Sequence, residues 1–188
     1  LAAGAEYDIL NFNSPYMEEH GRASDHDAYV GQFDLSSDDE FNLSIMHTND
    51  THAHVEGYPR LITAVNELRS QKENSLLVDA GDVFSGTLYF RQYLGLADLH
   101  FMNHLNYDAM TLGNHEFDKD SKTLANFINE MKFPMVSSNV NVTADADLGP
   151  LFKNEIGTPG EGGNIYPAII KEVDGEKVGI YGLTTPDT

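Results

Sequence analysis

Three short polar clusters contain the residue types that bind divalent metal ions. They are Asn49-Asp50-Thr51-His52, Gly81-Asp82 and Gly113-Asn114-His115-Glu116. Each cluster follows a stretch that reads as a β-strand, and parallel α/β sheets bind ligands outside the carboxyl ends of their strands. Carboxylates combined with neutral imidazoles suit borderline ions such as Zn, Mn, Fe or Co. The three clusters therefore predict a metal site at one edge of a sheet.

The spacing within the clusters favours chelation. Asp50 and His52 are two residues apart, so in an extended segment their side chains point the same way and can hold one ion. Gly81 and Gly113 each precede a polar residue at a strand-to-loop turn, where a positive φ is expected. Short matches of this kind are common singly, but three of them in order on successive strand ends point to one site.

The elements that must position these clusters alternate between strand and helix. Apolar patterns predict strands over residues 41–47, 75–79, 108–112 and 135–139. Helical periodicity predicts helices over residues 60–70, 88–105 and 121–132. Beyond Asn141 the chain is rich in Gly and Pro, and Asp174-Gly175 predicts a hairpin between two later strands. This alternation predicts a mostly parallel α/β sheet covered by helices.

Composition excludes some classes of partner. The chain has 30 acidic and 11 basic residues among 188, a formal charge of −19, and no basic stretch that could follow a phosphate backbone. We therefore expect no nucleic-acid binding by this chain alone. There are no cysteines, which excludes disulfides and thiolate metal sites. No apolar run approaches the roughly 20 residues of a membrane span, and a start at Leu1 without a signal-peptide pattern indicates a fragment or processed product.

The clusters and their surroundings resemble the first three motifs of the metallophosphoesterases. The segments His47-Thr48-Asn49-Asp50-Thr51-His52, Asp79-Ala80-Gly81-Asp82, Gly113-Asn114-His115-Glu116-Phe117-Asp118 and Gly182-Leu183-Thr184-Thr185-Pro186 carry the resemblance. They are similar to the 5′-nucleotidase/UDP-sugar hydrolase/2′,3′-cyclic nucleotide phosphodiesterase family of calcineurin-like metallophosphoesterases. The similarity covers about residues 41–188. It implies an α/β fold of the αββα sandwich type, incomplete in this chain.

The resemblance also implies the metal ligands. Asp50 and His52 would bind the first ion, Asp82 would bridge both ions, and Asn114 would bind the second. Two cations roughly 3.5–4 Å apart can clamp phosphate oxygens and activate a water as nucleophile. The cofactors expected are thus two divalent ions of the Zn, Mn, Co or Fe type.

Two further residues are assigned to catalysis by the same resemblance. His115 would contact the scissile phosphate, and Asp118 would orient His115. Asp118 also has a structural interpretation, because Asp is a common N-cap of a helix. The family completes its metal site with later histidines, whereas no histidine follows His115 here. We therefore expect residues 1–188 alone to be nearly inactive.

Other polar residues near the clusters have simpler interpretations. Glu116 is expected to face away from the metals or to hold its loop, and His54 to lie at the surface. His100 and His104 are spaced i, i+4 on a predicted helix, a geometry that can bind metal. Without the glutamate of the zinc-protease pattern, they are interpreted as surface or core residues.

The first forty residues differ in character, with ten acidic residues and one basic residue. Ser24-Asp25-His26-Asp27 and its flanking segments resemble the last strands of an endonuclease/exonuclease/phosphatase domain, the DNase-I-like fold. In that family an Asp-His pair belongs to the active site, which points to Asp25 and His26. The predicted organisation is a nuclease-like tail over residues 1–35, an acidic linker over 36–40, and part of a metallophosphoesterase domain over 41–188.

The resemblance predicts that the parent protein is a two-metal 5′-nucleotidase acting on nucleotide phosphomonoesters. One alternative is a 2′,3′-cyclic nucleotide 2′-phosphodiesterase/3′-nucleotidase on the same scaffold. An alternative of another class is a non-catalytic surface module. The resemblance also implies a secreted bacterial protein, extracellular or associated with the cell wall.

Overall fold

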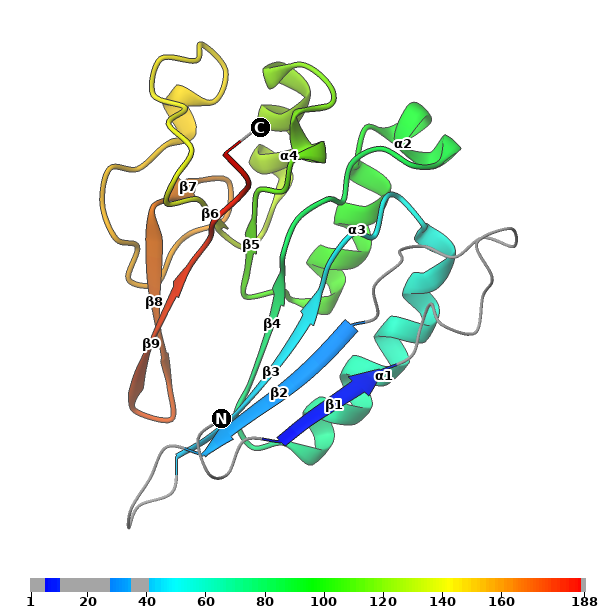
Figure 1. Cartoon of the computed structure of the whole chain (residues 1–188), viewed down its shortest axis with the longest axis vertical. Helices are drawn as coiled ribbons and strands as arrows, with labels where there is room; N and C mark the ends of the chain where they lie inside the picture. Colours follow the sequence, from blue (N-terminus) through cyan, green and yellow to red (C-terminus); the bar gives the residue numbers. More distant parts are fainter. Residues whose placement is uncertain (1–5, 11–27, 35–40, 187–188) are drawn as a thin grey trace.

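A computed structural model describes residues 6–10, 28–34 and 41–186 of the chain. Its main sheet has seven strands in chain order, with β3 to β7 parallel and β1 and β2 antiparallel at one edge (Figure 1). The strands are β1 (Glu6–Leu10), β2 (Ala28–Asp34), β3 (Asn42–Thr48), β4 (Ser75–Asp79), β5 (Ala109–Thr111), β6 (Met135–Val136) and β7 (Ile165–Tyr166). Because chain order equals sheet order, the carboxyl ends of β3, β4 and β5 meet side by side.

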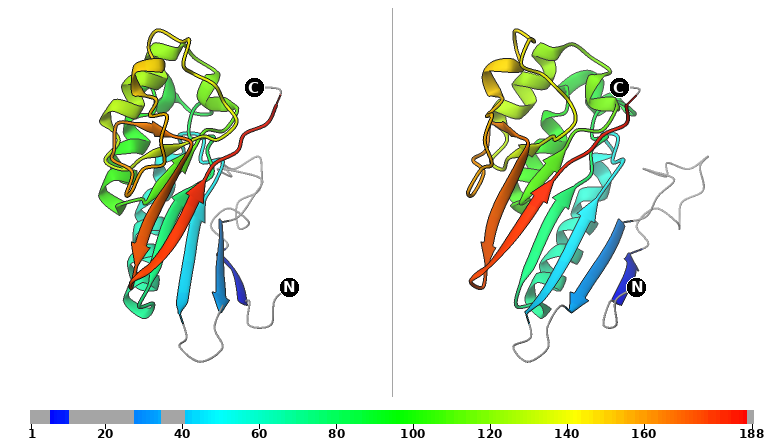
Figure 2. Two further views of the ribbon diagram at one scale, coloured as in Figure 1. Left: turned by 90° about the vertical axis from the view of Figure 1, so that its left-hand side faces the viewer. Right: turned by 60° about the vertical axis from the view of Figure 1, so that its left-hand side comes forward.

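The helices lie on one face of this sheet (Figure 2). They are α1 (Tyr58–Gln71), α2 (Leu88–Tyr93), α3 (Leu96–Leu105) and α4 (Ser121–Glu130), with short 3-10 turns η2 (Val55–Gly57), η3 (His115–Phe117) and η4 (Gly149–Leu151). The apolar side of α4 is fully buried through Leu124, Phe127 and Ile128, against sheet residues that include Leu77 and Met110. This packing is the expected α/β arrangement, and the predicted fold class is confirmed.

Two predicted elements differ from the structure: the strand predicted over residues 135–139 covers only Met135–Val136, and one predicted helix is interrupted. The single helix predicted over residues 88–105 is wrong, because the chain turns between α2 and α3. Leu94 and Gly95 both adopt left-handed backbone conformations there, with φ of 52° and 85°. A Cβ at Gly95 would lie 2.5 Å from the ring of Phe84 and 2.9 Å from that of Phe127, so only glycine fits this corner. Apolar residues continue through the turn, which explains why periodicity did not reveal it.

The N-terminal strands join the sheet through β3. Val30 of β2 lies opposite Met46 of β3, and β1 pairs with β2. Asp25 and His26 lie outside the described residues. The division into a nuclease-like tail, a linker and a phosphoesterase portion therefore stays a prediction.

A separate two-stranded sheet follows β7, formed by β8 (Ala168–Val173) and β9 (Glu176–Tyr181). Asp174 and Gly175 connect the strands with φ of 51° and 82°, which matches the predicted hairpin turn. The Lys171 ammonium group forms an ion pair with the Asp108 carboxylate, which ties this hairpin to the main sheet.

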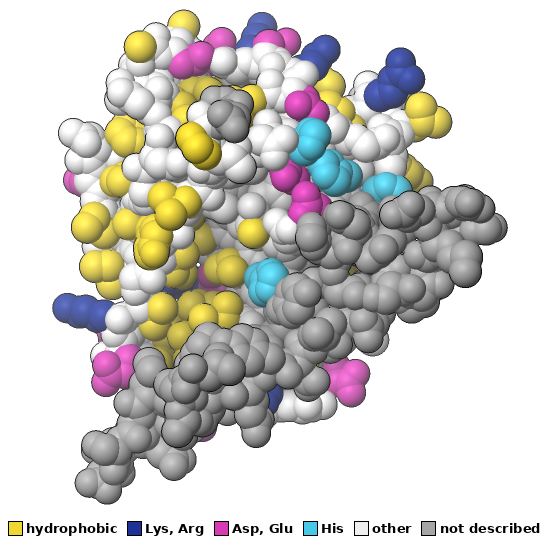
Figure 3. Space-filling view, viewed as in Figure 1, with side chains coloured by type: hydrophobic (Ala, Val, Ile, Leu, Met, Phe, Trp, Pro, Cys, Tyr) yellow, Lys and Arg dark blue, Asp and Glu magenta, His cyan; other side chains and the backbone are white. Residues whose placement is uncertain are grey.

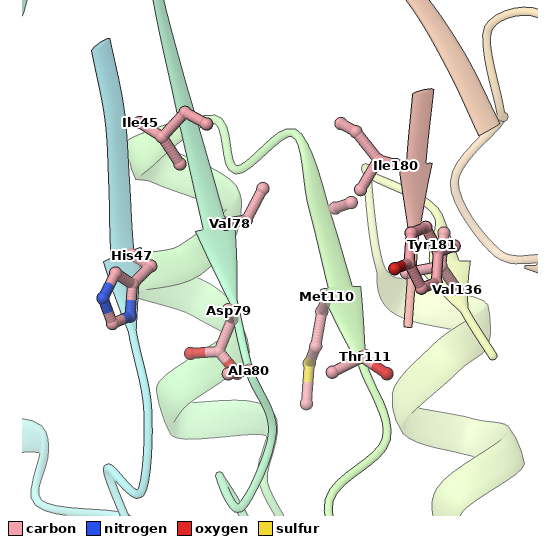
Figure 4. Close-up of a pocket in the computed structure, with 11 residues that line it drawn as sticks. Ile45, His47, Val78, Asp79, Ala80, Met110, Thr111, Val136, Ile180 and Tyr181 are labelled. Atoms are coloured by element: carbon pink, nitrogen blue, oxygen red, sulfur yellow. The ribbon is translucent and has the colours of Figure 1, made fainter. Parts of the chain in front are cut away.

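The other face of the main sheet carries no helix in the described part of the chain (Figure 2). A hollow of about 270 Å³ opens on this face between β3, β4, β5 and β9 (Figure 4). It is lined mainly by apolar side chains, among them Ile45, Val78 and Ile180. At its margin Tyr181 is 67% exposed, and Leu183 further along is 60% exposed. No helix in the described ranges has the length and apolar character needed to cross a membrane.

Candidate metal and phosphate site

The three predicted clusters converge at the carboxyl ends of β3, β4 and β5. Backbone hydrogen bonds join the first two loops: the N–H groups of Asp50, His52 and Ala53 donate to the carbonyls of Gly81, Asp82 and Val83, each at 3.1 Å. Figure 3 shows histidine and acidic side chains gathered on the surface above these strand ends. These backbone hydrogen bonds fix the loop after β3 to the loop after β4. They therefore also fix where the side chains of the two loops lie relative to one another.

Asp50, His52 and Asp82 form a group with metal-binding geometry. One ligand atom from each residue lies within 4.8 Å of the others, and His52 Nε2 is 3.6 Å from Asp50 Oδ1. His52 Nδ1 lies 2.8 Å from the carbonyl oxygen of Phe84, so Nδ1 carries the proton and donates it. This contact leaves the Nε2 lone pair free, as a metal-ligating histidine requires. Two carboxylates and one imidazole suit a borderline divalent ion, so the residues fit the expected cofactor.

The backbone that carries these ligands is not extended. Asp50, His52, Ala53 and Asp82 have φ values of 52°, 45°, 55° and 60°, all in the left-handed region. The prediction that an extended segment aligns Asp50 with His52 is therefore wrong. A left-handed conformation costs a non-glycine residue free energy, and such residues gather at functional sites where the surroundings hold them in place.

The two glycines of the clusters have different physical roles. Gly81 has a φ of 97°, as the sequence predicted. Gly113 does not belong to the positive-φ residues, so the prediction for it is wrong. A Cβ at Gly113 would lie 2.3 Å from Asp82 Oδ1, so glycine is needed there to admit the Asp82 carboxylate.

The third loop approaches through Asp82. The backbone N–H of His115 donates to Asp82 Oδ1 at 2.7 Å, which fixes this carboxylate between the loops. Asn114 is exposed and directly precedes His115 on the same loop. The structure thus brings the predicted second-metal ligand to the same edge as Asp82, and its role stays a prediction.

His115 and Asp118 form a hydrogen-bonded pair beside the metal group. Their Nδ1 and Oδ2 atoms are 2.7 Å apart, and the Ser85 hydroxyl donates to the same Asp118 oxygen. The ring of His115 meets that of His52 edge-to-face, with centroids 4.7 Å apart. The hydrogen bond to Asp118 raises the pKa of His115. Asp118 is not the N-cap of α4, because Asp120 accepts the capping hydrogen bond from the Thr123 N–H.

This pair gives a prediction about protonation. A raised pKa means that His115 holds its proton to higher pH than an ordinary histidine. We expect Asp118→Asn to lower the pKa of His115, because a neutral amide no longer stabilises the imidazolium. An NMR titration of the His115 ring would measure the shift. Asp120→Asn is the matched control and should leave the pKa of His115 unchanged. An equal pKa of His115 in the two variants would contradict the pairing of His115 with Asp118.

Glu116 has a role that the sequence only partly suggested. Its side chain is 1% exposed, and its carboxylate accepts hydrogen bonds from four backbone N–H groups at 2.7 to 3.3 Å. The donors belong to Asp82, Val83, Phe84 and Gly113. Glu116 therefore holds the loop after β4 against the loop after β5. Its place in a Gly-Asn-His-Glu cluster was the available signal, but the donors come from a separate segment.

A second buried carboxylate lies beneath the loops. Asp79 is buried and accepts a hydrogen bond from the Thr48 hydroxyl at 2.5 Å and from the Gly81 N–H at 2.9 Å. The Thr48 and Tyr107 hydroxyls are 2.8 Å apart. Burial raises the pKa of Asp79 to about 8, and the hydrogen bonds from Thr48 and Gly81 oppose part of this rise. This network fixes the last residue of β3 to the last residue of β4, and sequence reasoning missed it.

The other histidines of the described segments take no part in the metal group. His54 Nδ1 lies 2.9 Å from a Glu56 carboxylate oxygen. His100 and His104 are exposed on α3. Within the described ranges, the only group of three or more acidic or histidine side chains with metal-binding geometry is that of Asp50, His52 and Asp82.

A parallel sheet with these loops at its carboxyl edge defines a metallophosphoesterase-type domain. Comparison with known sequences supports this class: residues 43–178 match the family described as calcineurin-like phosphoesterase, and the chain belongs to that family. Members of this family use divalent metal ions, in accord with the group formed by Asp50, His52 and Asp82.

Its relatives are nucleotide phosphoesterases. The chain is 44% identical over 184 residues to the trifunctional nucleotide phosphoesterase protein YfkN of Bacillus subtilis, which covers 85% of this chain and 13% of that protein. It is 39% identical over 166 residues to the 5′-nucleotidase of Rattus norvegicus, covering 79% and 27%. A 5′-nucleotidase precursor from Thermus thermophilus superposes with a TM-score of 0.68 at 42% identity, covering 78% of this chain and 29% of that one. The chain thus spans less than a third of the length of each.

Proposed function

We propose that the protein containing this chain hydrolyses the phosphate monoesters of nucleotides, using two divalent metal ions. The observation that carries the proposal is the position of the Asp50, His52 and Asp82 group beside the His115–Asp118 pair, at one sheet edge. The relatives named as 5′-nucleotidases support the substrate class.

In this proposal Asp50, His52 and Asp82 hold the first ion, and Asp82 and Asn114 hold the second. A bound divalent ion polarises phosphoryl oxygens and lowers the pKa of a bound water. Asp50 and Asp82 offset the charge of the ions. His52 offers Nε2 as the ligand atom, because its Nδ1 donates to the carbonyl oxygen of Phe84.

His115 supplies the proton and positive charge of the proposed site. Its Nδ1 proton is held by Asp118, so a protonated ring presents Nε2–H as a donor. Placed against a phosphate, that donor stabilises charge growing on the phosphoryl oxygens or on the leaving oxygen. Asp118 keeps the ring oriented, and Ser85 keeps Asp118 in place through its hydroxyl hydrogen bond.

The described residues supply an incomplete ligand set for two ions. Three described residues are available for the first ion, but only Asp82 and Asn114 for the second. We therefore propose that residues 1–188 alone have little activity, and that the complete protein supplies the other ligands.

The test compares the complete protein with residues 1–188. With Mn²⁺ or Zn²⁺ added, the complete protein should release phosphate from adenosine monophosphate, and a chelator should abolish the activity. The isolated chain should release phosphate more slowly by about 100-fold or more, because the second metal ion lacks most of its ligands and contributes less to catalysis. Equal rates from both proteins would overturn the ligand argument, and metal-independent hydrolysis would overturn the proposed mechanism.

A cyclic-nucleotide activity is a second candidate, and the name of the Bacillus subtilis relative, a trifunctional nucleotide phosphoesterase, gives that protein more than one activity. Hydrolysis of 2′,3′-cyclic adenosine monophosphate in the same assay would identify it. A folded complete protein inactive on both substrates would instead support a non-catalytic surface module. We further propose an extracellular or cell-wall location, as the name of a snake venom 5′-nucleotidase suggests for that relative, and a nuclease-like origin for residues 1–35.

A further inference from the structure

The three loops that carry the proposed metal ligands meet at Gly81. Its carbonyl oxygen accepts the backbone N–H of Asp50 at 3.1 Å, which attaches the first loop to it. A Cβ on Gly81 would lie 2.3 Å from the backbone nitrogen of Gly113, so the third loop rests directly against this glycine. Asp82 is the next residue in the chain. Whatever fixes Gly81 therefore also fixes how the three loops lie relative to one another.

A network of buried side chains holds the backbone N–H of Gly81. This N–H donates to Asp79 Oδ1 at 2.9 Å, and the Thr48 hydroxyl donates to Asp79 Oδ2 at 2.5 Å. Thr48 gives its only hydroxyl proton to Asp79, so its oxygen accepts the hydrogen bond from the Tyr107 hydroxyl, 2.8 Å away. An unbroken chain of hydrogen bonds thus runs from Tyr107 to Gly81, and through the carbonyl of Gly81 to Asp50.

This network connects the loops to the rigid part of the fold. Thr48 and Asp79 are the last residues of β3 and β4 and lie opposite each other in the parallel pair. Tyr107 precedes β5, and its ring packs against that of Phe133 in the core, with centroids 5.7 Å apart. All three side chains of the network are buried. The network is therefore anchored in the sheet and the core at one end and reaches the ligand loops at the other.

We propose that Thr48, Asp79 and Tyr107 act as positioning residues for the metal ligands Asp50 and Asp82, through the glycine at which the loops meet. The inference rests on the proposed metal site. The three side chains are buried beneath the loops, so they act through the backbone and not by contact with substrate. Their loss leaves the ligand types unchanged and alters only how firmly the ligands are held.

Thr48→Val tests the centre of the network with a side chain of nearly the same shape. It removes the hydroxyl that joins Asp79 to Tyr107. We expect Mn²⁺ binding by the complete protein to weaken by about 10-fold, the scale seen when a group that supports a metal ligand is lost. Calorimetric titration with Mn²⁺ measures the affinity. In the metal-free protein, amide hydrogen exchange at Asp50 and Gly81 should become faster, because both N–H groups are then held less firmly.

Two further variants establish that the hydroxyl group is responsible. Thr48→Ser keeps a hydroxyl at this position and should retain the Mn²⁺ affinity of the unaltered protein. Tyr107→Phe removes only the outer hydroxyl and keeps the ring in the core. Thr48 can still donate to Asp79 in that variant, so the affinity should fall less than in Thr48→Val.

Thr123→Val is the matched control. The Thr123 hydroxyl also donates to an aspartate, Asp120, at 2.8 Å, at the start of α4. The control therefore removes the same kind of hydrogen bond from another part of the fold. It should lower the melting temperature and leave both the Mn²⁺ affinity and the exchange at Asp50 unchanged.

The outcomes separate the network from the metal site. Unchanged Mn²⁺ affinity and unchanged loop exchange in Thr48→Val would overturn the role of the network and leave the metal site intact. Equal weakening of Mn²⁺ binding in Thr48→Val and Thr123→Val would also overturn it, because the loss would then reflect general destabilisation. So would equal weakening in Thr48→Val and Thr48→Ser, because the hydroxyl would then be irrelevant.

An unaltered complete protein that binds no Mn²⁺ would overturn the metal site and this role of the network together. Weaker binding in Thr48→Val, with a smaller loss in Tyr107→Phe and none in Thr48→Ser or Thr123→Val, would support the proposal.

Discussion

Asp82→Asn should remove most of the metal content and most of the activity of the complete protein. The proposed bridging carboxylate is shared, so its loss weakens both ions at once. Asparagine keeps the size of the side chain and an oxygen that can still accept the His115 N–H, so the loop should remain folded. We expect turnover of adenosine monophosphate to fall by about 100-fold or more, the scale of losing a charge-stabilising group.

Metal analysis after dialysis, together with the initial rate, would measure both effects of Asp82→Asn. Asp147→Asn is the matched control, because it removes the same charge from an exposed position. It should bind metal and turn over substrate normally. A folded Asp82→Asn protein with full metal content and near-normal turnover would show that Asp82 does not bridge.

Glu116→Gln should be among the most destabilising single changes in this region. Two of the four N–H donors reach Oε1 and two reach Oε2, so an amide must place its NH₂ group against two donors. Leaving buried N–H groups unpaired costs on the order of 1–3 kcal/mol each. We expect a loss of about 2–4 kcal/mol in the free energy of unfolding, with the loop that carries Asp82 released first.

Urea unfolding would measure this loss. Glu56→Gln makes the same chemical change at a side chain that is 60% exposed, and should alter stability by less than about 0.5 kcal/mol. Similar transition midpoints for the two variants would mean that the Glu116 carboxylate is not needed to hold the loops together.

The sequence predicted which side chains lie together better than it predicted the backbone that carries them. Asp50, Asp82 and His115 could be grouped because strand order alone determines which loops share a sheet edge. The left-handed backbone conformations of Asp50 and Asp82 could not be predicted, since non-glycine residues seldom adopt this region of φ. The paired loops impose it through the hydrogen bonds to Gly81 and Val83.

Buried polar networks were the other feature beyond the reach of sequence reasoning. Asp79 reads as an ordinary polar residue, because nothing local marks a carboxylate for burial. Its hydrogen-bond partner Thr48 lies 31 positions earlier in the chain. The break at Gly95 was hidden for a similar reason: the rings of Phe84 and Phe127 that demand a glycine there are remote in sequence.

The helix-free face of the sheet has a consequence for handling the chain in solution. Tyr181 lines an apolar hollow, the exposed Leu183 lies two residues further along, and within the described residues β9 pairs only with β8. An apolar face that no helix of the described residues covers, next to a strand edge without a partner among them, favours the association of two copies. The strong negative charge opposes such contact at low ionic strength, and added salt screens that repulsion. The chain should therefore be kept dilute and in little salt, whereas the high-salt buffers that protect many acidic proteins would promote its precipitation.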